Sequence, residues 1–197
     1  MSNDRLVLMD LETFGLNPKT DFILEIGFKI VDLDLNVFDD FQRCVWDTPA
    51  YDGRYDALRF AAQAGDTSSQ FVLDMHQKSD LWQECRQKGV SVQEAITDTV
   101  HWLNTYGINK TDPIVGSSIG FDRSMLWAQM PEIDELFSYR SIDISSTKEL
   151  CMRYNPDLYA RLDEVTNQQK LHRSLSDIDD SIEELRFYRD EFLLTAF

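Results

Sequence analysis

The 197-residue chain lacks the features that mark membrane-spanning, secreted and disulfide-linked proteins. It has no apolar run of membrane-spanning length, so we expect no membrane span. Its first residues, MSNDRLVLMD, lack the basic-then-apolar order of a signal peptide. The cysteines, Cys44, Cys85 and Cys151, are odd in number and too far apart for a metal-binding pair. These absences favour a cytoplasmic protein with reduced thiols.

Basic residues are also scarce. The chain has 19 Lys and Arg against 35 Asp and Glu, which gives a formal net charge of -16. Long DNA or RNA is usually gripped by arrays of basic side chains, and this chain cannot offer a wide basic surface. If it binds nucleic acid, we expect it to hold a short piece, or to hold it through metal ions. A soluble acidic protein without such a ligand would have the same charge.

The order of predicted strands and helices indicates a single α/β domain over residues 1–197, with a mixed sheet. Three strands are predicted first, at 5–11, 22–31 and 35–46, and the turns between them favour an antiparallel meander. Two later strands, within DPIVGSSIGFD and RSIDIS, alternate with helices predicted over DRSMLWAQM and STKELCMRY. No internal repeat or low-complexity tract divides the chain.

Two further helices are predicted from their ends and their apolar spacing. Ser91 and Glu94 form a capping box at the start of one, and Gly107 ends it. The other is a long amphipathic helix over 174–194. Its predicted core face consists of Leu175, Ile178, Ile182, Leu185 and Phe192, with Tyr188 beside it. Residues 47–70 are predicted to be irregular, with a short helix around ALRFAAQA, and residues 163–172 to form a polar loop.

Two carboxylates end the first predicted strand, in LVLMDLETFGLNP. Because strand side chains alternate, Asp10 and Glu12 face the same side. Adjacent like charges at the edge of a core repel each other and lose solvation. A divalent cation relieves both effects, and Mg²⁺ and Mn²⁺ prefer carboxylate oxygens. A solvated strand end is the alternative interpretation of these two residues alone.

More distant residues offer partners for this pair. Asp122 lies where the GSSIGF turn enters a predicted helix, and LHRSLSDIDD puts His172 five residues before Asp177. In one continuous helix these two side chains would diverge by roughly 140°. We therefore predict His172 in the loop or first turn and Asp177 inside the helix.

Taken in order, these motifs resemble a known family. D-x-E on the first strand, an Asp after GSSIGF and H-x4-D near the C-terminus resemble the DEDDh 3′→5′ exonucleases of the ribonuclease H-like fold. Within that group the chain resembles the oligoribonucleases. The similarity runs through MDLETFGLNPKTDFILEIG, GSSIGFDRSML, YRSIDISSTKEL and HRSLSDIDDSIEELRFYRDEF, which together extend along nearly the whole chain.

The resemblance implies two-metal-ion hydrolysis of short oligoribonucleotides, down to dinucleotides, into mononucleotides. Asp10, Glu12, Asp122 and Asp177 would hold two Mg²⁺ or Mn²⁺ ions. His172, whose unperturbed pKa lies near 6.5, would act as general base. The fold implied is a ribonuclease H-like mixed sheet flanked by helices.

The resemblance also implies a substrate pocket. Leu16 would wedge between bases, Phe71 would stack on one, and His76 would touch the terminal sugar. The 5′ phosphate would be closed in by polar side chains and a stacking ring, namely Ser118, Tyr139, Arg140, Ser145 and Ser146. In the family the Tyr-Arg pair comes from a second subunit, so a homodimer is implied. Without the resemblance, Arg140 would pass for a surface ion-pair partner, and Leu16 and Phe71 for core residues.

Three departures from the family pattern bear on the substrate. Ser117 replaces the usual Asn of the middle motif, Phe71 takes the place of a Trp, and the segment 47–70 is longer than usual. A 3′→5′ DNA exonuclease of proofreading or strand-trimming type shares the same active-centre motifs. A catalytically inactive homologue that binds a partner is the remaining alternative.

Overall fold

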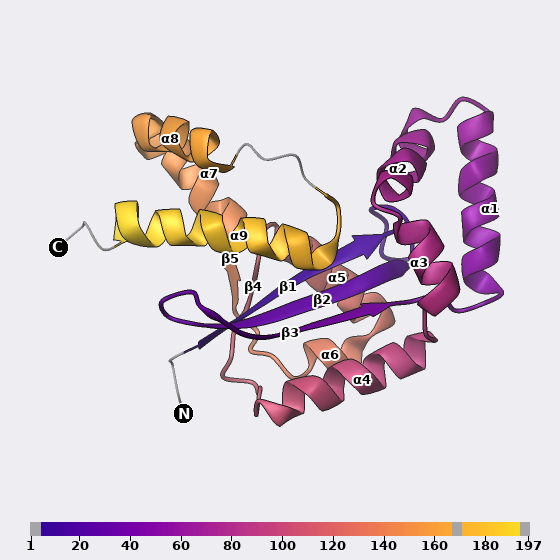
Figure 1. Ribbon diagram of the computed structural model, residues 1–197, viewed down its shortest axis with the longest axis horizontal. Coiled ribbons are helices and arrows are strands. Elements are labelled where there is room, and N and C mark those ends of the chain that lie inside the picture. Colours follow the sequence, from indigo (N-terminus) through magenta and orange to yellow (C-terminus); the bar gives the residue numbers. More distant parts are fainter. Residues whose placement is uncertain (1–4, 167–170, 194–197) are drawn as a thin grey trace.

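The computed structural model describes residues 5–166 and 171–193. Its elements are β1 (Arg5–Thr13), β2 (Ile23–Asp32), β3 (Val37–Cys44), α1 (Ala50–Gln63), α2 (Thr67–Lys78), α3 (Leu81–Lys88), α4 (Val92–Thr105), β4 (Ile114–Gly116), α5 (Ile119–Gln129), α6 (Pro131–Asp134), β5 (Ser141–Asp143), α7 (Ile144–Tyr154), α8 (Pro156–Thr166), α9 (Ser174–Tyr188) and the π-helical turn η1 (Arg189–Leu193). Helix α9 crosses the sheet at a shallow angle to β1 and β2 (Figure 1).

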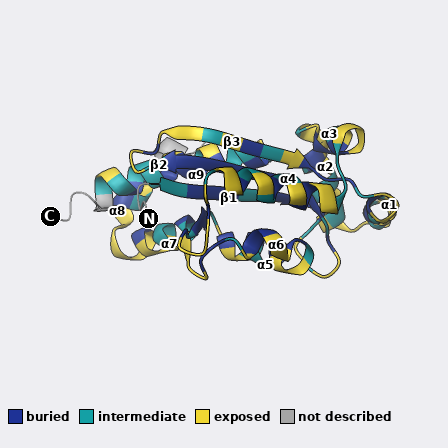
Figure 2. Ribbon diagram, turned by 90° about the horizontal axis from the view of Figure 1, so that it is seen from below, coloured by how far each residue is buried: buried dark blue, intermediate teal, exposed yellow. Residues whose placement is uncertain are grey.

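The strands form one mixed sheet in the order β3-β2-β1-β4-β5. The first three strands pair antiparallel, whereas β4 pairs parallel to β1 and β5 parallel to β4. The predicted meander, followed by strands that alternate with helices, is confirmed. β2 is the most protected strand, because nine of its ten residues are buried and it lies between β1 and β3 (Figure 2).

Strand alternation divides the core between the two faces of the sheet. Val7, Met9 and Leu11 of β1 pack in a cluster that includes residues of α4, α5 and α6. Leu8 packs instead in a second cluster, with residues of α7, α8 and α9. Asp10 and Glu12 continue the alternation of Leu8, so both carboxylates point toward the α9 face.

Two predicted helices form as their sequences indicate. The Ser91 hydroxyl accepts the N–H of Glu94 at 3.2 Å and caps α4, and Gly107 follows the helix with φ +64°. In α9, Ile178 and Ile182 are buried in the second cluster, with Tyr188 beside them. The prediction of one continuous helix to residue 194 is wrong in part, because η1 replaces the α-helix at Arg189.

The prediction that residues 47–70 are irregular is wrong in part: the short helix expected around ALRFAAQA forms, but it belongs to a longer helix. Helix α1 occupies most of this segment, and Asp66 caps α2 by accepting the N–H of Ser69 at 2.8 Å. The polar composition hid a narrow apolar stripe: Tyr51 and Leu58 are buried, and the Tyr51 hydroxyl donates to the Ile23 carbonyl at 2.9 Å. Tertiary contacts therefore extend the helix beyond the short segment that the sequence indicates.

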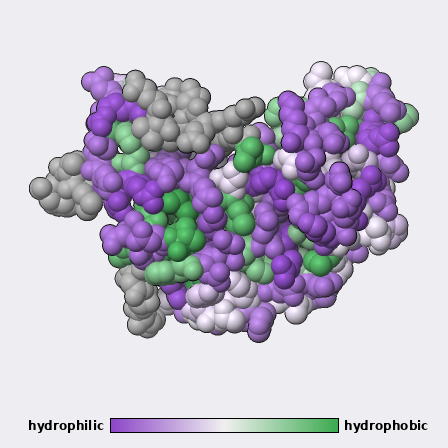
Figure 3. Space-filling model, viewed as in Figure 1, coloured by the Kyte–Doolittle hydropathy of each residue, from purple (hydrophilic) through white to green (hydrophobic). Residues whose placement is uncertain are grey.

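The predicted polar loop 163–172 is also wrong in part. Helix α8 continues to Thr166, and residues 167–170 lie outside the described part of the chain. Across residues 5–166 and 171–193, no helix combines the length and the apolar character that a membrane span requires. Hydrophilic residues cover much of the face that carries α1, α2 and α9, as the net charge suggests (Figure 3).

Candidate active site

The site begins at the end of β1, where the sequence places its two carboxylates. Glu12 is buried with 5% of its surface exposed, and Asp10 is half-buried. Across the ladder, Asp10 lies opposite Gly27 and Glu12 opposite Glu25, and the register shifts between Glu12 and Thr13. The strand thus ends with both acids on the face that α9 covers.

Asp122 joins this pair from the first turn of α5. It is 5% exposed, and its Oδ1 accepts the backbone N–H of Leu11 at 3.1 Å. Leu11 lies between Asp10 and Glu12, so this hydrogen bond ties the start of α5 to the two carboxylates. Ser118, the residue before α5, has a left-handed backbone conformation with φ +53°. With this conformation, only two residues separate the end of β4 from the start of α5.

His172 and Asp177 approach from the other side, at the start of α9. His172 has φ +51° and lies just before the helix, whereas Asp177 lies in its first turn, as predicted. One ligand atom each from Glu12, His172 and Asp177 all lie within 4.8 Å of one another. The three residues come from two segments that are 160 positions or more apart in the chain, and the fold brings them together.

The electrostatics of this cluster fit a divalent cation. Burial, followed by the charges of Asp177 and Glu25, raises the pKa of Glu12 to about 8. Burial also raises the pKa of Asp122 to about 7. Carboxylates in such surroundings repel one another unless protons or cations compensate them, and hard oxygen donors are what Mg²⁺ and Mn²⁺ prefer. The residues present therefore fit the metal that the motifs imply.

A pocket of about 220 Å³ opens beside the carboxylates. It is lined by Asp10, Ser117, Ser118, Ser145, Lys148, Asp177, Ser181 and Glu184. Ser117, which replaces the family's usual Asn, shares a hydrogen bond of 3.1 Å with the Ser181 hydroxyl. The small hydroxyl therefore keeps a polar link between the β4–α5 turn and α9.

Lys148 is a site residue that the sequence interpretation missed. It lines the same pocket as Asp10 and Asp177, and its Nζ lies 3.7 Å from Glu184 Oε2. Its spacing offered a signal, because a residue three positions after Ser145 on a helix shares its face. Lys148 places a positive charge beside two acids in a strongly acidic chain.

The predicted phosphate-binding serines lie together at the rim of this pocket. Asp143 Oδ1 accepts the backbone N–H groups of Ser118 and Ser145, each at 3.0 Å. The hydroxyls of Ser118 and Ser145 are 3.1 Å apart. Ser146 lines a shallow hollow next to them. Asp143 therefore organises two separate segments into one group of donors.

Leu16 and Phe71 lie together in a second pocket, of about 660 Å³. Leu16 is 80% exposed and Phe71 63% exposed. The alternative interpretation of these residues as core is wrong, because they lie on the wall of the pocket, and Leu58 and Met75 line it as well. Exposed apolar side chains on the wall of such a pocket suit a flat aromatic ligand.

His76 lies under the cluster and is fully buried. Its Nε2 is 2.9 Å from the Thr13 carbonyl oxygen, which can only accept, so Nε2 carries the proton. Nδ1 then lies 3.7 Å from Glu12 Oε2. Burial lowers the pKa of His76 to about 4, so the ring is neutral at neutral pH.

Tyr139 and Arg140 do not join the other predicted residues. Tyr139 is 84% exposed and lines a separate pocket of about 590 Å³ with Arg123 and Trp127. The Arg140 guanidinium donates to the Tyr139 hydroxyl at 3.1 Å and lies over its ring, 5.4 Å from the centroid. Neither residue lines the pocket that contains Asp10 and Asp177.

Comparison with known proteins identifies the family. A family model described as "Exonuclease" matches residues 56–185. The oligoribonuclease of Pseudoalteromonas atlantica is 33% identical over 93% of this chain and 93% of its own length. The oligoribonuclease of Leifsonia xyli is 36% identical over 95% of this chain and 84% of its own. This chain belongs to the oligoribonuclease family of exonucleases. The family expected from the motifs is thereby confirmed.

Solved structures support the fold. The chain superimposes on Escherichia coli exonuclease I, from the zinc-bound form of its complex with single-stranded DNA, with a TM-score of 0.65 and 15% identity over 98% of this chain. Exonuclease I of Methylocaldum szegediense gives a TM-score of 0.63 and 19% identity over 96%. The chain spans about 42% and 41% of the lengths of these proteins. The ribonuclease H-like α/β fold expected from the sequence is confirmed.

Proposed function

We propose that this oligoribonuclease-family exonuclease is a single domain that hydrolyses short oligoribonucleotides from the 3′ end, down to dinucleotides, with divalent cations. The observation that carries the proposal is the convergence of Glu12, His172 and Asp177 within 4.8 Å of one another. Similarity over nearly the full length of relatives named oligoribonuclease supports the substrate class. The sequence retains every acid of the motif and His172, which disfavours the alternative of a catalytically inactive binding module.

Asp10, Glu12, Asp122 and Asp177 would hold two Mg²⁺ or Mn²⁺ ions. When bound, these ions would activate the attacking water and stabilise charge on the phosphate and the leaving oxygen. The chain's own contribution would be to bring carboxylates from β1, α5 and α9 to one site. His172 would accept the proton of the attacking water at its imidazole. Its position before α9, next to Glu12 and Asp177, suits that role.

The flanking pockets would hold the two ends of a short substrate. Leu16 and Phe71 would hold bases in the 660 Å³ pocket. His76 is fully buried, with Nδ1 enclosed 3.7 Å from Glu12 Oε2, so it would support Glu12 and not touch the terminal sugar as the family resemblance implied. Ser118, Ser145 and Ser146 would donate to the phosphate at the 5′ side, and Lys148 would add the positive charge.

Tyr139 and Arg140 would act on a second copy of the chain. They are exposed on a surface separate from the pocket of Asp10, and a large exposed aromatic residue is typical of a contact surface. We therefore propose a homodimer in which each subunit closes the 5′ side of the other's site. Action in the cytoplasm follows from the same proposal, since short RNA fragments accumulate where RNA is degraded.

Cleavage against substrate length tests the proposal. In the presence of Mn²⁺, the cleavage rates of RNA and DNA of two to twenty nucleotides would be compared at equal concentrations of 3′ ends. We expect the highest rate on RNA of two to five nucleotides and a steep fall with length. Equal or higher rates on twenty-nucleotide DNA would overturn the substrate assignment in favour of a DNA exonuclease. Absence of divalent-dependent cleavage of any substrate would favour a binding module.

A further inference from the structure

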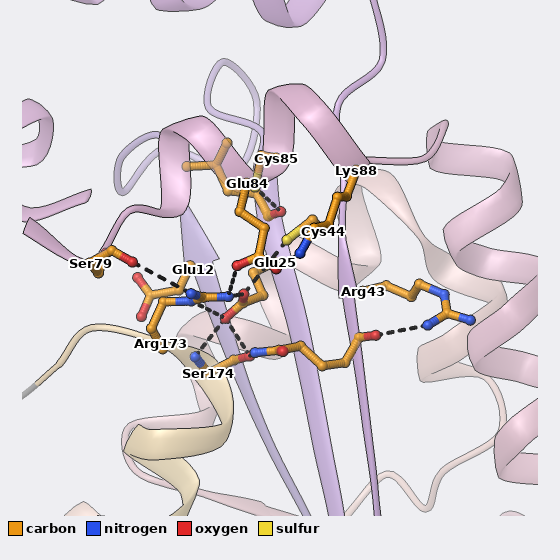
Figure 4. A network of polar contacts seen from close by, with 12 residues as sticks. Glu12, Glu25, Arg43, Cys44, Ser79, Glu84, Cys85, Lys88, Arg173 and Ser174 are labelled. Carbon is orange, nitrogen blue, oxygen red and sulfur yellow. Dashed lines mark hydrogen bonds and ion pairs between the residues drawn. The ribbon is translucent and has the colours of Figure 1, made fainter. Parts of the chain in front are cut away.

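A second glutamate, Glu25 of β2, lies opposite Glu12 but has different partners (Figure 4). It is fully buried. Its Oε2 accepts from Arg173 Nε at 3.0 Å and from Arg173 Nη2 at 2.6 Å. Its Oε1 accepts the backbone N–H and the hydroxyl of Ser174, both at 2.8 Å. One carboxylate thus binds the two residues that directly follow His172.

Arg173 is also bound from a second direction. Its Nη2 donates to Glu84 Oε2 of α3 at 2.7 Å, and its Nη1 lies 3.5 Å from the Ser79 carbonyl (Figure 4). A planar guanidinium with partners on two sides has little rotational freedom. Arg173 is therefore fixed between β2 and the α2–α3 segment.

The start of α9 also rests directly on β2. A Cβ added to Gly27 would lie 2.5 Å from the Ser174 hydroxyl, so only glycine leaves room there. Two residues along the strand, Lys29 forms an ion pair with Asp179 of α9. Glu25, Gly27 and Lys29 are each two residues apart, so they lie on the same face of β2. The first turns of α9 pack against this face.

His172 has an unfavourable backbone conformation next to this contact. Its φ of +51° is in the left-handed region, which a residue with a side chain adopts only when its neighbours impose it. The bonds from Glu25 to Arg173 and Ser174 supply that constraint on its C-terminal side. The same conformation brings the imidazole within 4.8 Å of Glu12 and Asp177.

We propose that Glu25 is a positioning residue that holds His172 in the catalytic centre through Arg173 and Ser174. The proposal rests on the proposed role of His172 as general base. Glu25 touches neither substrate nor metal in this account. Loss of its charge would free the residues after His172 and lower the fraction of molecules with the imidazole in place, without changing the pockets that bind the oligonucleotide.

Steady-state kinetics of Glu25→Gln provides the first test. We expect kcat on a dinucleotide with Mn²⁺ to fall by about 10- to 100-fold, because small displacements of a reacting group have effects of that size. KM should stay within about threefold. Asp112→Asn is the matched control: Asp112 is a buried carboxylate paired with Arg5 at the far end of β1. It should lower thermal stability and leave kcat unchanged.

Histidine NMR provides a readout that does not depend on turnover. The chain has three histidines, so metal-free protein with labelled imidazoles gives three sets of signals, and His172→Gln assigns one of them. In Glu25→Gln we expect the His172 signal to broaden or split while that of His101 is unchanged. Arg173→Lys, which keeps the charge but loses the planar fork, should reproduce both effects if Glu25→Gln does not fold.

The outcomes separate the two proposals. Unchanged kcat and an unchanged His172 signal in folded Glu25→Gln or Arg173→Lys would overturn the positioning role and leave Glu25 a purely structural residue. Full activity of His172→Gln would instead overturn the proposed general base. In that case a disturbed His172 signal in Glu25→Gln would show that the contact still orders the segment.

Discussion

Glu12 and Glu25 lie opposite each other on β1 and β2, on the same face of the sheet, and among the described residues Arg173 forms an ion pair with Glu25 and not with Glu12. Glu25 receives Arg173 and Ser174. For Glu12, burial, followed by the charges of Asp177 and Glu25, raises the pKa to about 8. The pair therefore separates two tasks: one carboxylate holds the polypeptide, and the other remains available for a cation.

The stability of the metal-free protein should fall as pH rises. An acid whose pKa is higher in the folded than in the unfolded state stabilises the fold while it is protonated, and this contribution is lost as pH rises from the unfolded value toward the folded one. For Glu12 that window runs from 4.5 to about 8. We expect the Tm measured in EDTA to decrease across this window and Mn²⁺ to restore it.

Glu12→Gln is the control for that titration. The amide cannot ionise, so above pH 8 the metal-free variant should be more stable than the wild type, gain less Tm from Mn²⁺, and be inactive. A wild-type Tm in EDTA that rises steadily from pH 5 to pH 8 would contradict the description of Glu12 as a buried carboxylate whose ionisation destabilises the metal-free fold.

Loss of the His172 imidazole should affect catalysis more than metal binding. His172→Gln should lower kcat by about 10²- to 10⁴-fold, the usual contribution of a general base. Because the four carboxylates remain, the rise in Tm on adding Mn²⁺ should be nearly the same as in the wild type. Single-turnover cleavage and thermal melts measure the two effects separately. A lost Mn²⁺ response would instead make His172 chiefly a metal ligand.

Lys148 should favour substrates that carry a terminal 5′ phosphate. Charged hydrogen bonds contribute about 1.5–3 kcal/mol, so Lys148→Met should raise KM at least about tenfold for a 5′-phosphorylated dinucleotide. The effect should be smaller for the same dinucleotide without that phosphate. Arg153→Met is the control, since Arg153 lies on the same helix and pairs with Glu149. Equal effects on both substrates would place Lys148 at another phosphate.

Complementation between inactive variants tests the shared site. Arg140→Ala should be inactive because its subunits cannot close one another's sites, and Asp177→Asn because its own carboxylate is missing. In a mixed dimer, the Asp177→Asn subunit would supply Arg140 to the intact centre of its partner. Random mixing in equal amounts would then restore about a quarter of the wild-type activity. No recovery, with subunit exchange verified, would argue that each subunit completes its own site.

The sequence predicted the sheet and the placement of Asp10 and Glu12 on one face because both depend on strong local patterns. Alternation on β1 places Asp10 and Glu12 on one face whatever surrounds them, and the spacing of His172 and Asp177 already required a break before the last helix. These local features need no knowledge of distant contacts, whereas the expectation that Asp122, His172 and Asp177 join them came from the family resemblance. The antiparallel meander followed from the turn residues in the same way.

The features that sequence could not supply depend on tertiary packing. The first part of helix α1 was interpreted as a loop because the helix buries only single residues, Tyr51 and Leu58. Glu25 was unremarkable within ILEIG, since its significance lies in Arg173, 148 positions away in the chain. The role of Lys148 likewise depends on the packing of α7 against α9, because residues of both helices line one pocket.

The most direct test of the catalytic account is a time course on a five-nucleotide RNA labelled at its 5′ end, with Mn²⁺, for the wild type and Asp177→Asn. We predict that the wild type shortens the labelled RNA by one nucleotide at a time from the 3′ end, until a labelled mononucleotide remains. EDTA or the substitution Asp177→Asn should stop this shortening. Undiminished cleavage by Asp177→Asn, or internal cuts without a ladder, would contradict a 3′→5′ exonucleolytic centre built on Asp10, Glu12, Asp122 and Asp177.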